Sequence, residues 1–140
     1  MRGTETLEVA DILFTFQVDR RSRTVRSKAR GVIRIDALVE HVHTLAKEKV
    51  FAYPHLIDAR EARLRITAGD VRKLVDRIET LRKIHGTART AFVTRYPADF
   101  GMMRMYGTLS EECDPGFAVF REIGEAENWI LSREMVRKGT

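Results

Sequence analysis

Hydrophobic and polar residues alternate along two segments near the start of the chain. In residues 12–18 every second position is apolar, as Ile12, Phe14, Phe16 and Val18. Alternation with this period is typical of a β-strand that buries one face. Residues 24–31 alternate in the same way, and residues 19–23 between them are polar and few enough for a turn. We therefore expect a hairpin of two antiparallel strands.

Three shorter apolar segments follow, at His55–Asp58, Thr90–Thr94 and Phe117–Phe120. Each is too short for a helix, and Pro54 and Pro115 stand just ahead of the first and the last. Strands that are apolar on both faces at their centre are typical of buried parallel sheets. We interpret these three segments as strands of one such sheet.

Apolar residues at helical spacing occupy the gaps between these strands. The first helix is expected to begin after Asp36 as its N-cap and to end near Lys49. In the second helix, Thr67 and Asp70 have the spacing of a capping box, and Gly86 stands where the helix would end.

Two further helices complete the pattern. The third is expected from Asp99 to about Glu112, and the fourth from about Ile123 onwards, whereas the charged segment Arg60–Arg65 is expected to be a connection. The resulting order, ββαβαβαβα, predicts an α/β fold with a single mixed, mostly parallel five-stranded sheet and about four helices. The chain has 140 residues and no internal linker, so we predict one domain over 1–140 with a core at about 11–131.

Several short patterns in this order resemble a known family. They are Gly31-Val32-Ile33 followed by Asp36, Leu56-Ile57-Asp58-Ala59-Arg60, Gly101 to Tyr106, Val119-Phe120-Arg121, and Glu125-Ala126 followed by Trp129. The chain resembles the STAS-like fold of the bacterial anti-sigma-factor antagonists, and in local pattern a group of STAS-like bacterial proteins of unassigned role. The resemblance covers about residues 11–130 and implies a regulatory or ligand-sensing module rather than an enzyme.

One departure from that family concerns its phosphorylation switch. The antagonists carry an Asp-Ser-Ser-Gly motif after the middle strand, but here Asp58 is followed by Ala59, Arg60, Glu61 and Ala62. No Ser or Thr occurs until Thr67, so the family's switch is not expected in this chain.

Charge is concentrated in one part of the sequence. The formal net charge is +5, and residues 20–34 hold seven Lys or Arg and no Asp or Glu. Arg26, Lys28 and Arg30 are two apart, so they share one face of the second strand. Like charges at this spacing favour an anionic partner such as nucleic acid, but they also suit a solvated edge strand that resists sheet pairing, and we prefer the second interpretation.

The segment after the third strand is a second candidate site. Ligands of α/β sheets gather at the carboxyl ends of parallel strands, and helix N-termini attract anions. Asp58, Arg60 and Thr67 are therefore candidates for the rim of a ligand site. The alternative, which we prefer, is structural, with Asp58 bonded to backbone amides and Thr67 acting only as a cap.

The methionine-rich third helix is a third candidate. Met102, Met105, Tyr106 and Leu109 form a stripe that we assign to the core, whereas Phe100 and Met103 lie on another side. Phe100, Met103, Arg104 and Tyr106 are accordingly predicted to contact a ligand or partner. A small apolar or lipid-like ligand carried beneath this helix is one alternative, and a subunit contact in a homodimer is another.

Residues typical of catalysis or metal binding are not arranged in a known motif. No G-x-S-x-G, P-loop or G-x-G-x-x-G pattern occurs, and Cys113 is the only cysteine. We assign no catalytic residue, no metal and no cofactor. With no apolar segment in residues 1–8 and none long enough to span a membrane, we expect a cytoplasmic protein.

Overall fold

A computed structural model describes residues 4–8, 14–87 and 89–139, with side chains for 14–87 and 89–131. Its six strands form one sheet in the order in which they occur along the chain. They are β1 (Thr4–Glu8), β2 (Phe14–Asp19), β3 (Thr24–Ile33), β4 (His55–Leu64), β5 (Thr90–Thr94) and β6 (Phe117–Phe120). The pairs from β1 to β3 are antiparallel and those from β3 to β6 are parallel.

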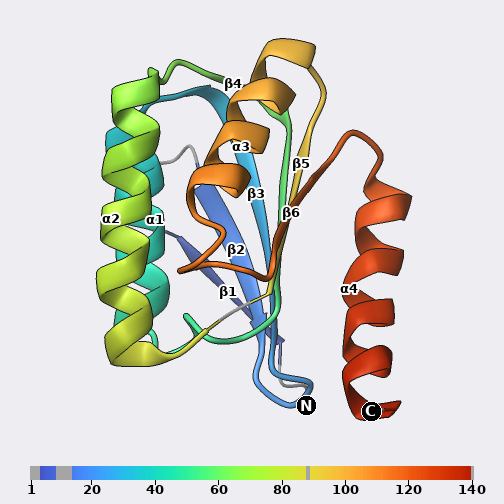
Figure 1. Ribbon diagram of the computed structural model, residues 1–140. Helices are drawn as coiled ribbons and strands as arrows, with labels where there is room; N and C mark the ends of the chain where they lie inside the picture. Colours follow the sequence, from blue (N-terminus) through green and yellow to red (C-terminus); the bar gives the residue numbers. More distant parts are fainter. Residues whose placement is uncertain (1–3, 9–13, 88, 140) are drawn as a thin grey trace.

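Helices cover both faces of this sheet, but unequally. They are α1 (Ile35–Lys47), α2 (Ala68–His85), α3 (Pro97–Leu109) and α4 (Ile123–Gly139). Figure 1 shows α1, α2 and α3 on one face and α4 on the other. Because the parallel strands follow one another in sequence and their three crossover helices share a face, the winding direction never reverses. The sheet therefore lacks the switch point at which ligands of doubly wound sheets bind.

The predicted α/β fold is confirmed, with five strands and four helices in the predicted order. The structure adds β1 ahead of them, paired with β2 at the edge of the sheet. Residues 12 and 13 of the first predicted strand lie outside the described residues.

The prediction that Arg60–Arg65 is a connection is wrong, because β4 continues to Leu64. Its second half pairs with the second half of β3, from Arg30 opposite Glu61 to Ile33 opposite Leu64. Ala62 in this segment is buried in the core. The sequence of this segment does not look like a strand, because most of its side chains are charged and only its few apolar residues face the core.

The helix ends follow the sequence signals in part. Thr67 and Asp70 form the predicted capping box, and Gly86 ends α2 with φ +98°, a conformation that favours glycine. The assignment of Asp36 as N-cap is wrong, since α1 begins at Ile35 and Asp36 lies in its first turn. Asp99 is the third residue of α3 rather than its start, and it is buried, accepting a hydrogen bond from the Leu64 amide at 3.2 Å.

The α2 cap yields a direct prediction. Thr67→Ala is expected to lower the free energy of unfolding by about 1 kcal/mol, because the Asp70 amide loses its side-chain acceptor. Thr80→Ala is the matched control on the same helix, since the exposed Thr80 hydroxyl donates only to the Asp76 carbonyl and alanine favours helix. Urea unfolding of both variants measures the difference, and an equal effect of the two would contradict the role of the cap.

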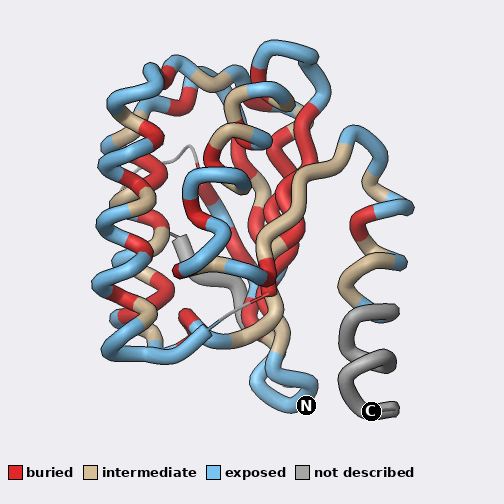
Figure 2. Tube along the Cα trace, viewed as in Figure 1, coloured by how far each residue is buried: buried red, intermediate tan, exposed pale blue. Residues whose placement is uncertain are grey.

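The hydrophobic core is divided by the sheet. Figure 2 shows buried positions along the strands and along the helix faces that meet the sheet. The larger cluster lies between the sheet and helices α1, α2 and α3. It includes Phe14, Phe16 and Val18, which alternate along β2 with less buried residues such as the exposed Thr15. The smaller cluster joins the sheet to α4 through Leu56, Ala91, Val93 and Ala126.

Candidate functional site

A cavity of about 70 Å³ lies within the larger cluster, between the sheet and helices α1, α2 and α3. Most of its wall is apolar and includes Leu38, Leu45, Ile57, Leu74, Ile78 and Phe92. His55 and Thr90, the first residues of β4 and β5, also line it. The cavity is therefore near the amino ends of the parallel strands, opposite to the end at which the sequence predicts a rim.

Three polar side chains from α2, α3 and the segment after α3 line one part of this cavity. The Tyr106 hydroxyl donates to Asp114 Oδ2 at 2.8 Å. Burial raises the pKa of the Asp114 carboxyl, although the Tyr106 hydrogen bond and the positive charge of Arg82 both oppose this rise. Arg82 Nε is buried and has no hydrogen-bond partner among the described residues. An isolated buried donor is costly, so this atom marks the place where a ligand or water acceptor would be stabilised.

Two buried histidines form a second polar group beside the cavity. Ser27 Oγ lies 3.1 Å from His41 Nε2 and 2.5 Å from His55 Nε2, which joins β3, α1 and β4. Burial lowers the pKa of His41 from 6.5 to about 3. Burial, together with the neighbouring His41, lowers the pKa of His55 well below 6.5. Both imidazoles are therefore neutral at pH 7, and His41 Nδ1 has no hydrogen-bond partner among the described residues.

The residues predicted on α3 separate into a buried and a surface pair. Met103 and Tyr106 are each 2% exposed and line the cavity. Phe100 is half-buried, and the exposed Arg104 places its guanidinium carbon 5.9 Å from the centre of the Phe100 ring. Phe100, Met103 and Arg104 also line a surface groove of about 390 Å³ beside the edge strand β6.

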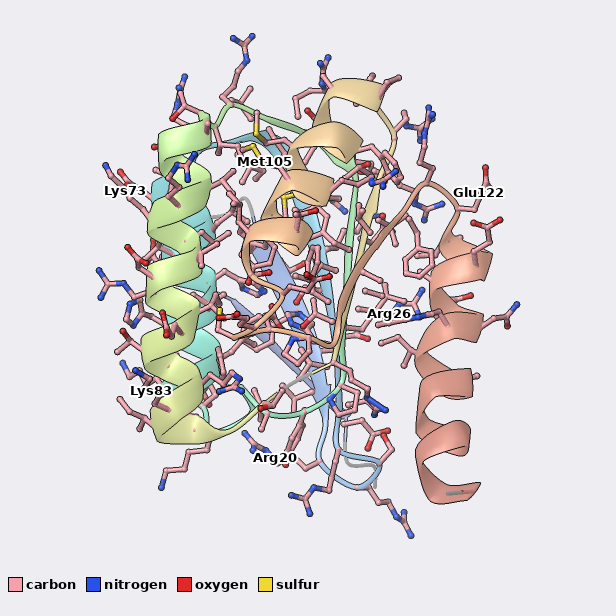
Figure 3. The ribbon with its side chains drawn as sticks, viewed as in Figure 1. Arg20, Arg26, Lys73, Lys83, Met105 and Glu122 are labelled. Carbon is pink, nitrogen blue, oxygen red and sulfur yellow. The ribbon has the colours of Figure 1, made fainter. Side chains whose placement is uncertain are left out.

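The predicted core stripe of α3 is therefore partly wrong. Leu109 is 40% exposed, and Met102 and Met105 are only half-buried, whereas Met103 is in the core. Figure 3 shows Met105 at the side of α3 that faces α2. The buried positions are Asp99, Met103, Tyr106 and Ser110, which share one helix face. Two of these four, Asp99 and Ser110, are polar, so the most apolar stripe of the helix is not its most buried face.

Only two of the three candidate rim residues are brought together, because Thr67 lies apart from Asp58 and Arg60. Asp58 and Arg60 form a two-point ion pair, with Arg60 Nε to Oδ1 and Nη2 to Oδ2 both at 2.8 Å. They alternate along β4 with Ile57 and Ala59 of the larger core cluster, so they face the α4 side of the sheet. Thr67 instead caps α2, which lies on the other side. Hydrogen bonding to Arg60 lowers the pKa of Asp58, and this pair is satisfied internally.

The three basic residues of β3 occupy one face of the strand, as their spacing predicts. Figure 3 shows Arg26 between the sheet and α4, where its Nη2 lies 2.6 Å from Glu127 Oε2. Lys28 and Arg30 both lie near Glu61, at 2.9 Å and 3.6 Å. Neighbouring carboxylates thus offset the repulsion that suggested an anionic partner.

Four polar residues of the cavity that carry its chemistry were not predicted from the sequence, namely His41, His55, Arg82 and Asp114. His41 lies three residues after Leu38 and four before Leu45, and Arg82 lies four after Ile78, so both are on the apolar stripes of their helices. A polar residue within an apolar helical stripe was therefore the feature of the sequence that could have identified His41 and Arg82. No pattern in the sequence marks His55 or Asp114, because each reaches the site through the packing of distant segments.

Within the part of the chain that the structure describes, no group of three or more His, Cys, Asp or Glu side chains is placed to hold a metal ion. None of the helices in residues 4–8, 14–87 and 89–139 has the length and apolar character needed to cross a membrane. Comparison of the chain with protein-family models, with curated proteins and with solved structures found no match.

Proposed function

We propose that this protein is a binding module of the STAS-like type that its sequence resembles, and that its ligand is a small, mainly apolar molecule held in the cavity. The observation that carries this proposal is an apolar cavity in which two buried polar atoms, Arg82 Nε and His41 Nδ1, have no hydrogen-bond partner among the described residues. Apolar pockets with a few converging polar groups are the usual form of small-molecule sites. The cavity lies next to Met103, as a carrier of a small apolar molecule beneath α3 requires.

The size of the cavity limits the ligand. An apolar cavity of about 150 Å³ holds benzene, and the cavity here is about 70 Å³. The ligand is therefore a molecule of a few heavy atoms, or the end of a longer chain. Regulation would follow if occupancy changed how α1, α2 and α3 pack on the sheet.

Filling the cavity tests this function. Val42 and Val39 are both half-buried on α1, but only Val42 lines the cavity, while Val39 lies in the outer groove between α1 and α2. Val42→Phe is expected to weaken binding of small apolar probes at least tenfold, and Val39→Phe is expected to leave it unchanged. Titration of short alcohols and alkanes, followed by amide chemical shifts, measures both. Probe binding that Val42→Phe does not alter would refute the proposal.

A homodimer and a cytoplasmic location, both expected from the sequence, belong to this proposal as well. The edge strand β6 and the groove lined by Phe100 and Arg104 are the surface on which a second copy or another partner would bind. Sedimentation over a range of protein concentrations tests the dimer. Arg104→Ala is the variant that tests this surface, because it leaves the core intact. A substitution of the buried Met103 would disturb the core as well.

A further inference from the structure

We infer that the cavity selects an uncharged ligand bearing a hydroxyl group, which binds between Arg82 and Asp114. This inference rests on the proposed function, since it requires the cavity to hold a ligand. It starts from two side chains that line the same cavity: a buried guanidinium N–H without a partner and a carboxylate that Tyr106 only partly satisfies.

The hydrogen-bonding capacity of these groups defines the ligand. Arg82 Nε can only donate, and an ionised carboxylate can only accept. Tyr106 donates to Asp114 Oδ2, which leaves Oδ1 as an acceptor. This part of the cavity therefore presents one donor and one acceptor. A hydroxyl group matches both, because its oxygen accepts from Arg82 while its proton is donated to Asp114.

Charge excludes the closest alternatives. A ligand carboxylate that accepts from Arg82 would lie beside the carboxylate of Asp114 in the same cavity, and two carboxylates that share a site repel each other. A ligand ammonium group would meet the positive charge of Arg82. A hydrocarbon fits the apolar wall but leaves the Arg82 donor unsatisfied, which disfavours it relative to an alcohol.

Ordered water is the competing occupant. A water molecule takes up about 30 Å³ of liquid, so a cavity of about 70 Å³ has room for very few, and one of them can bridge Arg82 and Asp114 in the same way. A ligand hydroxyl reproduces the hydrogen bonds of that water while its carbon atoms fill the apolar part. The inference therefore predicts a preference among ligands that water alone would not produce.

Three small probes test the inference on the full chain: ethanol, propane, in which a methyl group replaces the hydroxyl, and acetate. Titrations followed by amide chemical shifts of cavity residues give the three dissociation constants. We expect ethanol to bind about tenfold more tightly than either of the others, the loss associated with an unpaired buried group. Equal binding of ethanol and propane would overturn the inference but leave the proposed function standing. Failure of all three to bind would overturn both.

Two variants identify the groups responsible. Arg82→Met keeps the aliphatic stem but removes the donor, so ethanol should lose its advantage while propane still binds. Lys83→Met is the control, because the neighbouring Lys83 side chain is 71% exposed and points away from the core in Figure 3. Asp114→Asn removes the negative charge and should improve acetate binding relative to ethanol. An unchanged order of the three probes in both Arg82→Met and Asp114→Asn would contradict the assignment.

Discussion

Lowering the pH from 6.5 to 4.5 is expected to reduce the free energy of unfolding by about 2 kcal/mol through His41, with a further loss through His55. The cause is the burial of these two histidines, which are neutral in the folded protein and protonated in the unfolded chain. Each unprotonated imidazole costs about 1.4 kcal/mol for every pH unit below its unfolded pKa. Since domains of this kind have about 5–15 kcal/mol in total, the loss is a substantial part of the stability.

The sign of this effect follows from the direction of the shifts. Burial lowers the pKa of His41 from 6.5 to about 3, and that of His55 well below 6.5. Between pH 6.5 and 4.5 the unfolded state therefore binds more protons than the folded state, and stability falls as the pH falls. Asp114 acts in the opposite direction, because its raised pKa favours proton uptake by the folded state. Asp58, whose pKa is lowered, reduces stability only at more acidic pH, below 3.8.

The slope of stability against pH, rather than stability itself, is the quantity to measure. Urea unfolding at half-unit intervals of pH should give a free energy of unfolding that falls below pH 6 by about 1.4 kcal/mol per pH unit for each histidine that stays neutral. His41→Gln should reduce this slope by about half. His43→Gln, on the exposed side of the same helix, should leave it unchanged. A wild-type slope near zero between pH 6 and 4.5 would show that the histidines are not held neutral.

Phe16→Ala is expected to destabilise the protein by about 3–5 kcal/mol, the range for truncating a buried phenylalanine. Phe16 is 1% exposed, and its ring packs edge-on against His41 at 5.4 Å between ring centres. Removing the ring reduces the buried apolar surface area and adds empty space to a core that already holds a cavity. The expected change is a fall in Tm of about 10 °C or more.

A neighbour on the same strand provides the control for Phe16. Gln17 is exposed on the opposite face of β2, so Gln17→Ala should change the free energy of unfolding by less than about 0.5 kcal/mol. Thermal unfolding of the two variants at pH 7.5 keeps the histidines neutral in both states. A loss of under 1 kcal/mol for Phe16→Ala would mean that this face of β2 is not packed as described.

The α/β fold followed from local signals that need no knowledge of distant contacts. Alternation in β2 and β3, the Thr67 capping box and the glycine at the end of α2 each depend on residues a few positions apart. Such signals gave a wrong prediction where a segment with many charged residues is nevertheless part of the sheet. The charged second half of β4 is a strand because Ala62 packs in the core and β3 supplies its backbone partner, and neither fact is local.

The candidate site could be predicted only in small part. Met103 and Tyr106 were identified, because an unusual methionine-rich helix is visible in one segment. Asp58, Arg60 and Thr67 were candidates for one rim, but the alternation of side chains across the sheet places the first two on the face opposite α2.

The kind and order of the elements follow from local sequence, because the periodicity of helices and strands depends on neighbouring residues. The site forms only when distant segments of the chain pack together. Ser27, His41 and His55 meet because β3, α1 and β4 pack together. Arg82 and Asp114 line one cavity although they are 32 residues apart in the sequence. Burial changes the chemistry of these groups by removing water from around them, and which side chains lose their water is a property of the folded packing.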